Sequence, residues 1–235
     1  MKSVFFGSIG VVAETSNFQR EAYNTALNEA GLPWHWDPKT YRELLNYVGG
    51  QDRLRLLSNA TAAGLSDNVI ETIHSRKTKL ACAAIVDAKA PLRAGIELVT
   101  GMVKASGGKL GFVTSTSTQN INAIFDLGHE SFSRSAMDVV ICSDDVKIGK
   151  PAPDAYHAAL KKTGLAPGDV IAIEDTPSSA RAAKRAGLSV ILTPGAFASQ
   201  VETEDADIIL PSLTTTDGNL HGAVLNAIGA VEMAV

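Results

Sequence analysis

Three short segments of this chain carry side chains that can bind a phosphate group or a hard metal cation. The first follows the apolar run Leu110–Val113 and reads TSTST, so Thr114 and Ser115 open a turn rich in hydroxyl groups. Hydroxyls and backbone N–H groups at the start of a helix can donate hydrogen bonds to a phosphate. The same turn is also typical of an ordinary helix cap, because Ser and Thr are preferred there. The segment therefore indicates a phosphate-binding turn or a cap, and both interpretations stay open.

Two further segments supply charged groups. Lys150 opens the segment KPAP before a predicted helix, where a lysine can act as a point charge for phosphate or simply be solvated. Glu174 and Asp175 directly follow the apolar run Val170–Ile173. Two adjacent carboxylates suit a cation such as Mg²⁺, yet carboxylates also favour helix N-termini. The pair is accordingly either a metal site or a helix cap.

The elements that must position these groups form an alternating pattern. Short apolar runs, each typical of a buried strand, occur at Ser3–Phe6, Leu110–Val113, Val139–Ile141, Val170–Ile173, Val190–Leu192 and Ile208–Leu210. Amphipathic helical stretches separate most of them, which predicts an α/β fold with a Rossmann-like parallel sheet covered on both faces. Functional loops in such sheets lie at the carboxyl ends of the strands, so the loops after Phe6, Val113 and Ile173 should face one crevice. Residues 16–88 instead show helical periodicity and little strand signal, which predicts a small helical bundle.

The composition excludes several classes of function. The 235 residues carry a net charge of −4 from 21 basic and 25 acidic side chains, and aromatic residues make up 6%. A general nucleic-acid binder would show a basic excess or stacking aromatics, so no nucleic-acid partner is expected. The apolar run Val4–Ala13 is too short for a membrane span and lacks a signal-peptide cleavage site, so we expect a cytoplasmic protein without a membrane partner. Cys82 and Cys142 have no CxxC partner, and reduced thiols are expected.

The order of the three segments resembles that of a known family. The turn at Thr114, the Lys-Pro-x-Pro segment at Lys150 and the pair Glu174-Asp175 are similar to motifs two, three and four of the haloacid dehalogenase-like (HAD) phosphatases. The helical stretch inserted after the first strand resembles their C1-type cap. The resemblance implies an HAD-like core of residues 1–15 and 89–235 with a helical cap of residues 16–88. Within the cap, HWDPKTYRELLNYVGGQDRL resembles the branch of β-phosphoglucomutases and xylulose-1,5-bisphosphate phosphatases.

The resemblance implies a mechanism whose key residues are absent here. In the family, motif one reads D-x-D-G: the first Asp attacks phosphorus, the second moves a proton, and Mg²⁺ bridges the nucleophile, a backbone carbonyl and the motif-four carboxylate. Here Gly7 takes the nucleophile's place and Ile9 takes the acid/base position. Neither side chain can attack phosphorus, carry a proton or bind a metal, and covalent catalysis needs such a nucleophile. Magnesium, with Glu174 and Asp175 as its remaining carboxylate ligands, is therefore expected to bind weakly or not at all.

The cap side of the implied site departs from the family as well. Glu14 and Arg53 match the related bisphosphate phosphatases, whereas Gln19 stands where they tend to have His and Gln51 where they tend to have Lys. Catalytic charges and some substrate-reading charges have thus become neutral. That pattern is expected where catalysis is no longer needed.

Three functions stay open from the sequence. The first is a catalytically impaired HAD-fold protein that binds a phosphorylated small molecule or an inorganic anion through Thr114, Ser115 and Lys150. The second is an active Mg²⁺-dependent sugar-phosphate phosphatase with a non-standard nucleophile. The third is an interaction or structural protein with a relict pocket, although the sequence names no protein partner. The retained motif residues beside Gly7 and Ile9 favour the first function.

Overall fold

A six-stranded, all-parallel sheet in the order β3-β2-β1-β4-β5-β6 forms the centre of the molecule. The computed structural model describes residues 2–45, 49–197 and 204–229. The strands are β1 (Ser3–Phe6), β2 (Leu110–Val113), β3 (Val139–Ile141), β4 (Val170–Glu174), β5 (Ser189–Leu192) and β6 (Ile208–Ile209). Every strand predicted from an apolar run is present, with ends that agree within one residue, and the α/β fold class is confirmed.

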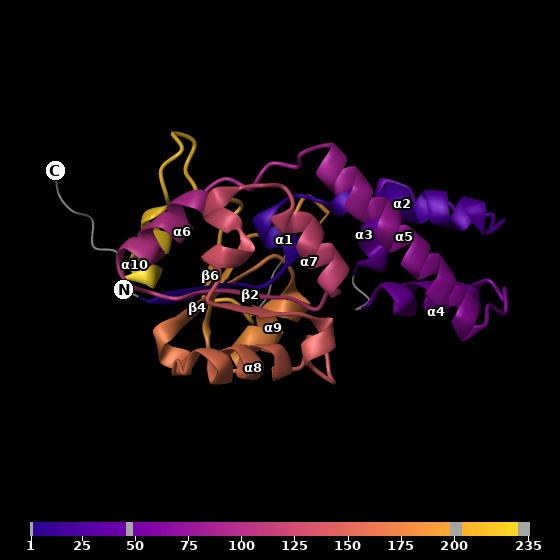
Figure 1. Cartoon of the computed structure of the whole chain (residues 1–235). Coiled ribbons are helices and arrows are strands. Elements are labelled where there is room, and N and C mark those ends of the chain that lie inside the picture. The colour runs from indigo at the N-terminus through magenta and orange to yellow at the C-terminus, as the bar shows by residue number, and fades with distance from the viewer. Residues whose placement is uncertain (1, 46–48, 198–203, 230–235) are drawn as a thin grey trace.

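Successive side chains of each strand lie on opposite faces of the sheet, and they pack into two hydrophobic clusters, one on each face. Val4 and Phe6 of β1 join one cluster, whereas Phe5 joins the other. The first cluster includes residues of α6 (Ile96–Ala105), α7 (Thr118–Phe125) and α10 (Gly222–Ile228), and the second includes residues of α8 (Asp154–Thr163) and α9 (Pro177–Arg185). Figure 1 shows these two sets of helices on opposite sides of the sheet. Burial on both faces explains why the strands read as continuous apolar runs.

A helical region with a hydrophobic core of its own lies between β1 and α6. After a single turn, α1 (Ile9–Val12), it comprises α2 (Ser16–Glu29), α3 (Pro38–Leu44), α4 (Gly50–Ala60) and α5 (Asp67–Asp87). Its buried cluster includes Tyr23 and Trp36, whose ring centroids are 4.2 Å apart. Asp37 caps α3 by accepting a 2.7 Å hydrogen bond from the Thr40 N–H. The helix ends at Leu44, and residues 46–48 lie outside the described part of the chain.

The two connections between the sheet and the helical region lie side by side. Ala13 and Leu92 form an antiparallel bridge, and the Arg93 N–H donates to the Val12 carbonyl at 2.7 Å. The domain boundaries predicted from the resemblance, at residues 15/16 and 88/89, lie near this junction and remain a proposal.

Shorter elements complete the described chain. They are the 3₁₀ turns η1 (Glu130–Phe132), η2 (Arg134–Ala136), η3 (Ser143–Asp145) and η4 (Pro167–Asp169). Among the described residues, no helix combines the length and the apolar character that crossing a membrane requires.

Candidate functional site

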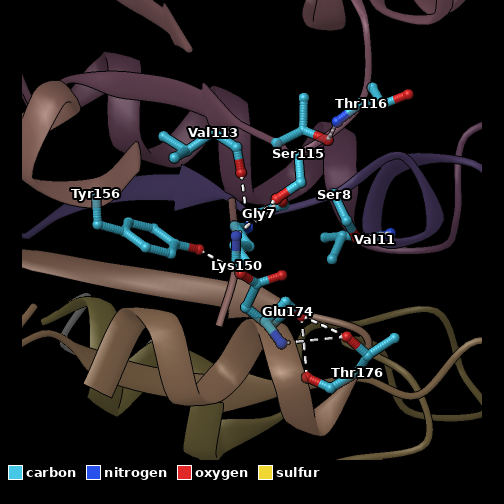
Figure 2. Close-up of polar contacts among 12 residues, drawn as sticks. Gly7, Ser8, Val11, Val113, Ser115, Thr116, Lys150, Tyr156, Glu174 and Thr176 are labelled. Atoms are coloured by element: carbon cyan, nitrogen blue, oxygen red, sulfur yellow. Dashed lines mark hydrogen bonds and ion pairs between the residues drawn. The ribbon is translucent and has the colours of Figure 1, made fainter. Parts of the chain in front are cut away.

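The three chemically interesting segments meet at the carboxyl edge of the sheet. β1 lies between β2 and β4, with Phe6 in register with Phe112 and Ile173. The residues that end or follow these strands therefore emerge next to one another, as the pattern of strands predicted. Figure 2 shows side chains from β2, β4 and the loop at Lys150 gathered around Gly7.

Lys150 is a buried cation whose hydrogen bonds all end on protein oxygens. Its ammonium group donates to the carbonyl oxygen of Gly7, to that of Val113 at 2.9 Å, and to Glu174 Oε1 at 2.7 Å. The Lys150 side chain is 5% exposed and that of Glu174 is fully buried. Lys150 is therefore neither solvated nor available as an unpaired positive charge.

Glu174 occupies the space that a side chain at residue 7 would need. A Cβ atom built on Gly7 would lie 2.0 Å from Glu174 Cδ and 2.1 Å from Oε2. Glu174 Oε1 accepts hydrogen bonds from Lys150 and from the Tyr156 hydroxyl, whereas Oε2 is buried and has no hydrogen-bond partner among the described residues. Burial and the Glu174 charge raise the pKa of Tyr156 well above its usual value, so this phenol stays a donor. A carboxylate from β4 thus fills the space beside Gly7 at the end of β1.

Asp175 has an internal partner as well. The Ser8 hydroxyl donates to its carboxylate, and Ser8 Oγ accepts from the Val11 N–H at 3.3 Å. Asp175 lies against Gly10, where a Cβ atom would be 2.1 Å from Oδ2. Burial and the neighbouring Glu174 charge raise the pKa of Asp175 to about 6, although Ser8, Lys150 and Arg93 each oppose this shift.

The helix-cap interpretation of the acidic pair is wrong. α9 is capped by Thr176, whose side-chain oxygen accepts from the Ser179 N–H at 3.3 Å. The carboxylates of Glu174 and Asp175 instead turn toward the end of β1. Capping of α9 therefore does not explain why Glu174 and Asp175 lie in the site.

The residues present do not fit the magnesium ion that the family resemblance implies. Mg²⁺ requires near-octahedral oxygen ligands, usually one or two free carboxylates together with waters and substrate phosphates. Here one carboxylate of the pair is bound to Lys150 and the other to Ser8, while the Ile9 carbonyl accepts the Ala13 N–H at 2.8 Å. Within the described residues, no group of three or more His, Cys, Asp or Glu side chains could hold a metal ion. Because these groups already have partners within the protein, we derive no catalytic step through a bound metal.

The hydroxyl-rich turn after β2 is connected to the helical region. Thr114 is buried and its Oγ1 accepts from the Thr116 N–H at 3.2 Å, whereas Ser115 is exposed and its Oγ accepts from the Lys150 N–H at 3.3 Å. The Asn120 side chain donates to Thr116 Oγ1 at 2.8 Å and lies 3.3 Å from the thiol of Cys82 on α5. The turn therefore lies under α5.

A second group of residues, which sequence reasoning missed, centres on Lys77 of α5. Lys77 is 6% exposed, donates to Gln19 Oε1 at 2.6 Å and lies 4.7 Å from the centre of the Tyr23 ring. Burial and the charge of Arg53 lower the pKa of Lys77 to about 8. Burial and the charges of Lys77 and Arg53 lower the pKa of His74 to about 4. We call Lys77, Arg53, His74 and Gln19 the cap cluster.

The sequence does contain a pattern that could have identified Lys77. It stands in helical register with Ile70, Ile73 and Ala81, all of which are buried on the same helix. A lysine within an apolar stripe must either be paired or be costly to bury. Such a lysine is a candidate binding residue.

The structure brings together some of the predicted cap residues and separates others. Gln19 and Arg53 join Lys77 in the cap cluster, and Arg53 donates to the Leu44 carbonyl at 3.0 Å and is hydrogen-bonded to Tyr23. Gln51 instead accepts from Arg55 at 3.2 Å, one turn along α4.

Glu14 lies at the junction of the sheet and the helical region. Its carboxylate accepts from the Ser16 N–H at 3.0 Å and from the Ala196 N–H at 2.8 Å.

Comparisons with known proteins identify the family to which this fold and sequence belong. Residues 1–187 match the haloacid dehalogenase-like hydrolase family. Protein CbbY of Cereibacter sphaeroides is 33% identical over 227 residues, which cover 97% of this chain and 98% of that protein. The plasmid CbbY of Cupriavidus necator is 33% identical over 91% of this chain and 86% of its own length.

Solved structures show the same likeness. CbbY from Rhodobacter sphaeroides in complex with phosphate superposes with a TM-score of 0.82 at 33% identity, covering 90% of this chain and 95% of that one. A mutant of the same protein in complex with xylulose-1,5-bisphosphate also gives a TM-score of 0.82, at 32% identity, covering 94% of this chain and 100% of that one. This chain therefore belongs to the haloacid dehalogenase-like hydrolase family, in the branch of CbbY and the β-phosphoglucomutases.

Proposed function

We propose that this protein binds a phosphorylated sugar between its sheet and its helical region and does not hydrolyse it. The observation that carries the proposal is the position of Glu174, whose carboxylate fills the space beside Gly7 and neutralises Lys150. A CbbY relative is known in complex with phosphate and with xylulose-1,5-bisphosphate, which supports a sugar phosphate as the class of ligand.

Hydrolysis through a phosphoenzyme needs a nucleophile and a group that moves a proton at the leaving oxygen. Gly7 and Ile9 supply neither. Glu174 is fully buried, and its Oε1 is held by Lys150 and Tyr156, so it cannot approach a phosphorus atom in line in this arrangement. Removal of a nucleophile in a well-studied hydrolase costs about 10⁶ in kcat, and removal of its catalytic partners as well costs little more.

Binding needs less than catalysis, and the groups for it are present. In the proposed site, Thr114, Ser115 and Lys150, the last already paired with Glu174, line the core side. Glu14, Gln19 and Arg53 line the cap side together with Lys77, whereas Gln51, directed to Arg55, stays a more distant candidate. A ligand between the two sides would contact both parts of the molecule.

Two measurements on the purified protein test this proposal. Release of inorganic phosphate is followed with Mg²⁺ and a panel of sugar phosphates that includes xylulose 1,5-bisphosphate, and the melting temperature is recorded with the same compounds. We expect no release above the protein-free reaction and a rise in melting temperature with at least one sugar phosphate.

Each alternative function predicts a different outcome. Mg²⁺-dependent release that Asp175→Asn abolishes, and that Lys79→Met on the exposed face of α5 does not, would show an active phosphatase and overturn the proposal. Indifference of the melting temperature to every sugar phosphate would remove the binding function and leave an interaction or structural protein.

A further inference from the structure

The loop that follows β5 is bonded to the junction between the sheet and the helical region. We call residues 193–197 the β5 loop. The guanidinium group of Arg93, on the second connection, donates to the Thr193 and Pro194 carbonyls at 3.0 Å each and to Thr193 Oγ1 at 3.0 Å. It also donates to the Gly10 carbonyl of α1 at 2.8 Å. The start of the β5 loop is therefore fixed to the junction.

The middle of the β5 loop is bonded to the first connection. Glu14 lies two residues before α2 begins. One oxygen of its carboxylate accepts from the Ser16 N–H at 3.0 Å, and the other accepts from the Ala196 N–H at 2.8 Å. Hydrogen bonds to a charged acceptor are stronger than those between neutral groups. A single side chain thus joins the start of the helical region to a loop of the sheet.

The end of the β5 loop packs against the hydrophobic core of the helical region. The Phe197 ring lies edge-on to that of Tyr41 on α3, with the ring centroids 5.5 Å apart at an interplanar angle of 81°. Among the described residues that form or cover this core, Phe197 alone comes from the sheet part of the chain, and all the others lie between Tyr23 and Leu80. The sheet therefore places one of its own side chains against the core of the helical region.

These contacts restrict how the two parts of the molecule can move. Two short connections that run side by side form a junction about which packed parts can rotate. The β5 loop adds a third link, which runs from this junction to α3. Rotation of the helical region away from the sheet must therefore separate the Phe197 and Tyr41 rings or break the hydrogen bond between Glu14 and Ala196.

We propose that the β5 loop is a strap that holds the helical region against the carboxyl edge of the sheet, and that release of Phe197 from Tyr41 lets the two parts open. The proposal concerns a movement of the chain itself, so it goes beyond the proposed function and applies whether or not a ligand binds. Loss of one aromatic contact disturbs only a small part of the packed chain, so this opening requires less free energy than global unfolding.

The two cysteines of the chain can report this opening separately from unfolding. The thiol of Cys82 on α5 lies 3.7 Å from the Gln119 carbonyl and 3.3 Å from the Asn120 side chain, where α5 packs against α7 (Figure 1). Burial raises the pKa of this thiol, and thiols react as thiolates, so the closed form reacts slowly. Cys142 follows β3 and is buried in the core beside the sheet. Opening should expose Cys82 alone, whereas global unfolding exposes both thiols.

Alkylation by iodoacetamide in native buffer, quantified for each cysteine peptide by mass spectrometry, tests the proposal. When reclosing is faster than alkylation, the rate at Cys82 is proportional to the fraction of open molecules. We expect Phe197→Ala to raise the rate at Cys82 by about tenfold and to leave the rate at Cys142 unchanged.

A second variant and a matched control complete the experiment. Glu14→Gln replaces one carboxylate oxygen by an NH₂ group beside a backbone N–H donor, so it should also raise the rate at Cys82. Ile148→Ala is the control, because it removes an exposed apolar side chain from another loop. It should leave both thiols at their wild-type rates.

The outcomes decide between a strap and a passive loop. Unchanged alkylation of Cys82 in both variants, or equal increases at Cys82 and Cys142, would overturn the proposal and show that the β5 loop only packs on a rigid molecule. Circular dichroism verifies the fold of each variant, and Glu14→Gln decides alone if Phe197→Ala does not fold. Phosphate release and sugar-phosphate binding are measured on the wild type, so failure of the proposed function leaves this result unaffected.

Discussion

Adding one methyl group at Gly7 should break the buried ion pair at the centre of the site. In Gly7→Ala the new Cβ would lie 2.0 Å from Glu174 Cδ, whereas carbon atoms in contact are normally about 3.5–4.0 Å apart. The carboxylate must therefore withdraw by more than about 1 Å from that position. Its Oε1 cannot then keep both the 2.7 Å contact with Lys150 and the hydrogen bond from Tyr156.

The cost of this movement follows from the burial of both charges. Breaking a buried ion pair destabilises a protein by about 3–5 kcal/mol, because the remaining charges stay out of water. Replacing Gly by Ala lowers the entropy of the unfolded chain and recovers about 0.4–1 kcal/mol. We therefore expect Gly7→Ala to lower the free energy of unfolding by about 2–4 kcal/mol.

Urea denaturation of a double-mutant cycle measures the effect. Glu174→Ala alone should be destabilising, because it leaves Lys150 buried without its counter-charge. In that background Gly7→Ala meets no carboxylate, so its cost should disappear and leave a coupling energy of about 2–4 kcal/mol. Gly101→Ala is the matched control: Gly101 is exposed within α6 and has open space at its Cβ position, so this change should stabilise by about 0.5–1 kcal/mol. A Gly7→Ala variant as stable as the wild type, or additive effects across the cycle, would refute the placement of Glu174.

Three further predictions concern charge. Lys77→Met should raise the free energy of unfolding at pH 7 by up to about 3 kcal/mol, because the pKa of Lys77 is about 8 in the folded protein against 10.5 for a free lysine, so folding penalises the charged side chain. Chemical denaturation at several pH values measures this gain, which should fade as the pH rises from 8 to 10.5. Asp175 affects stability at acidic pH, because its pKa is about 6 in the folded protein against 3.8 for a free aspartate. The free energy of unfolding of the wild type should therefore fall by up to about 3 kcal/mol as the pH rises from 4 to 6, and chemical denaturation of Asp175→Asn should not show this fall. The double change Gly7→Asp with Ile9→Asp should restore magnesium binding, measured by titration calorimetry, and some release of phosphate from sugar phosphates, provided that Glu174 gives way to the new side chain; a restored protein without metal affinity would mean that the pocket has decayed.

Much of this protein follows from local sequence. The strands are continuous apolar runs because both faces of a parallel sheet are buried, and this pattern needs no knowledge of the partner strands. The same reasoning places Thr114 and Glu174 at one edge of the sheet. The absence of carboxylates at Gly7 and Ile9 is also a fact of sequence, and it holds wherever the neighbouring side chains finally lie.

The partners of the charged groups were decided only by the tertiary structure. From the sequence, Lys150 could be either a solvated cation or a phosphate ligand. Its pairing with Glu174 depends on the empty space beside Gly7, which is distant in sequence and adjacent only in the folded sheet. Lys77 looks like one more lysine of an amphipathic helix until α2 covers it and brings Gln19 against it. Charge interactions depend on distance and exclusion of water, and both are properties of the packed chain rather than of spacing along it.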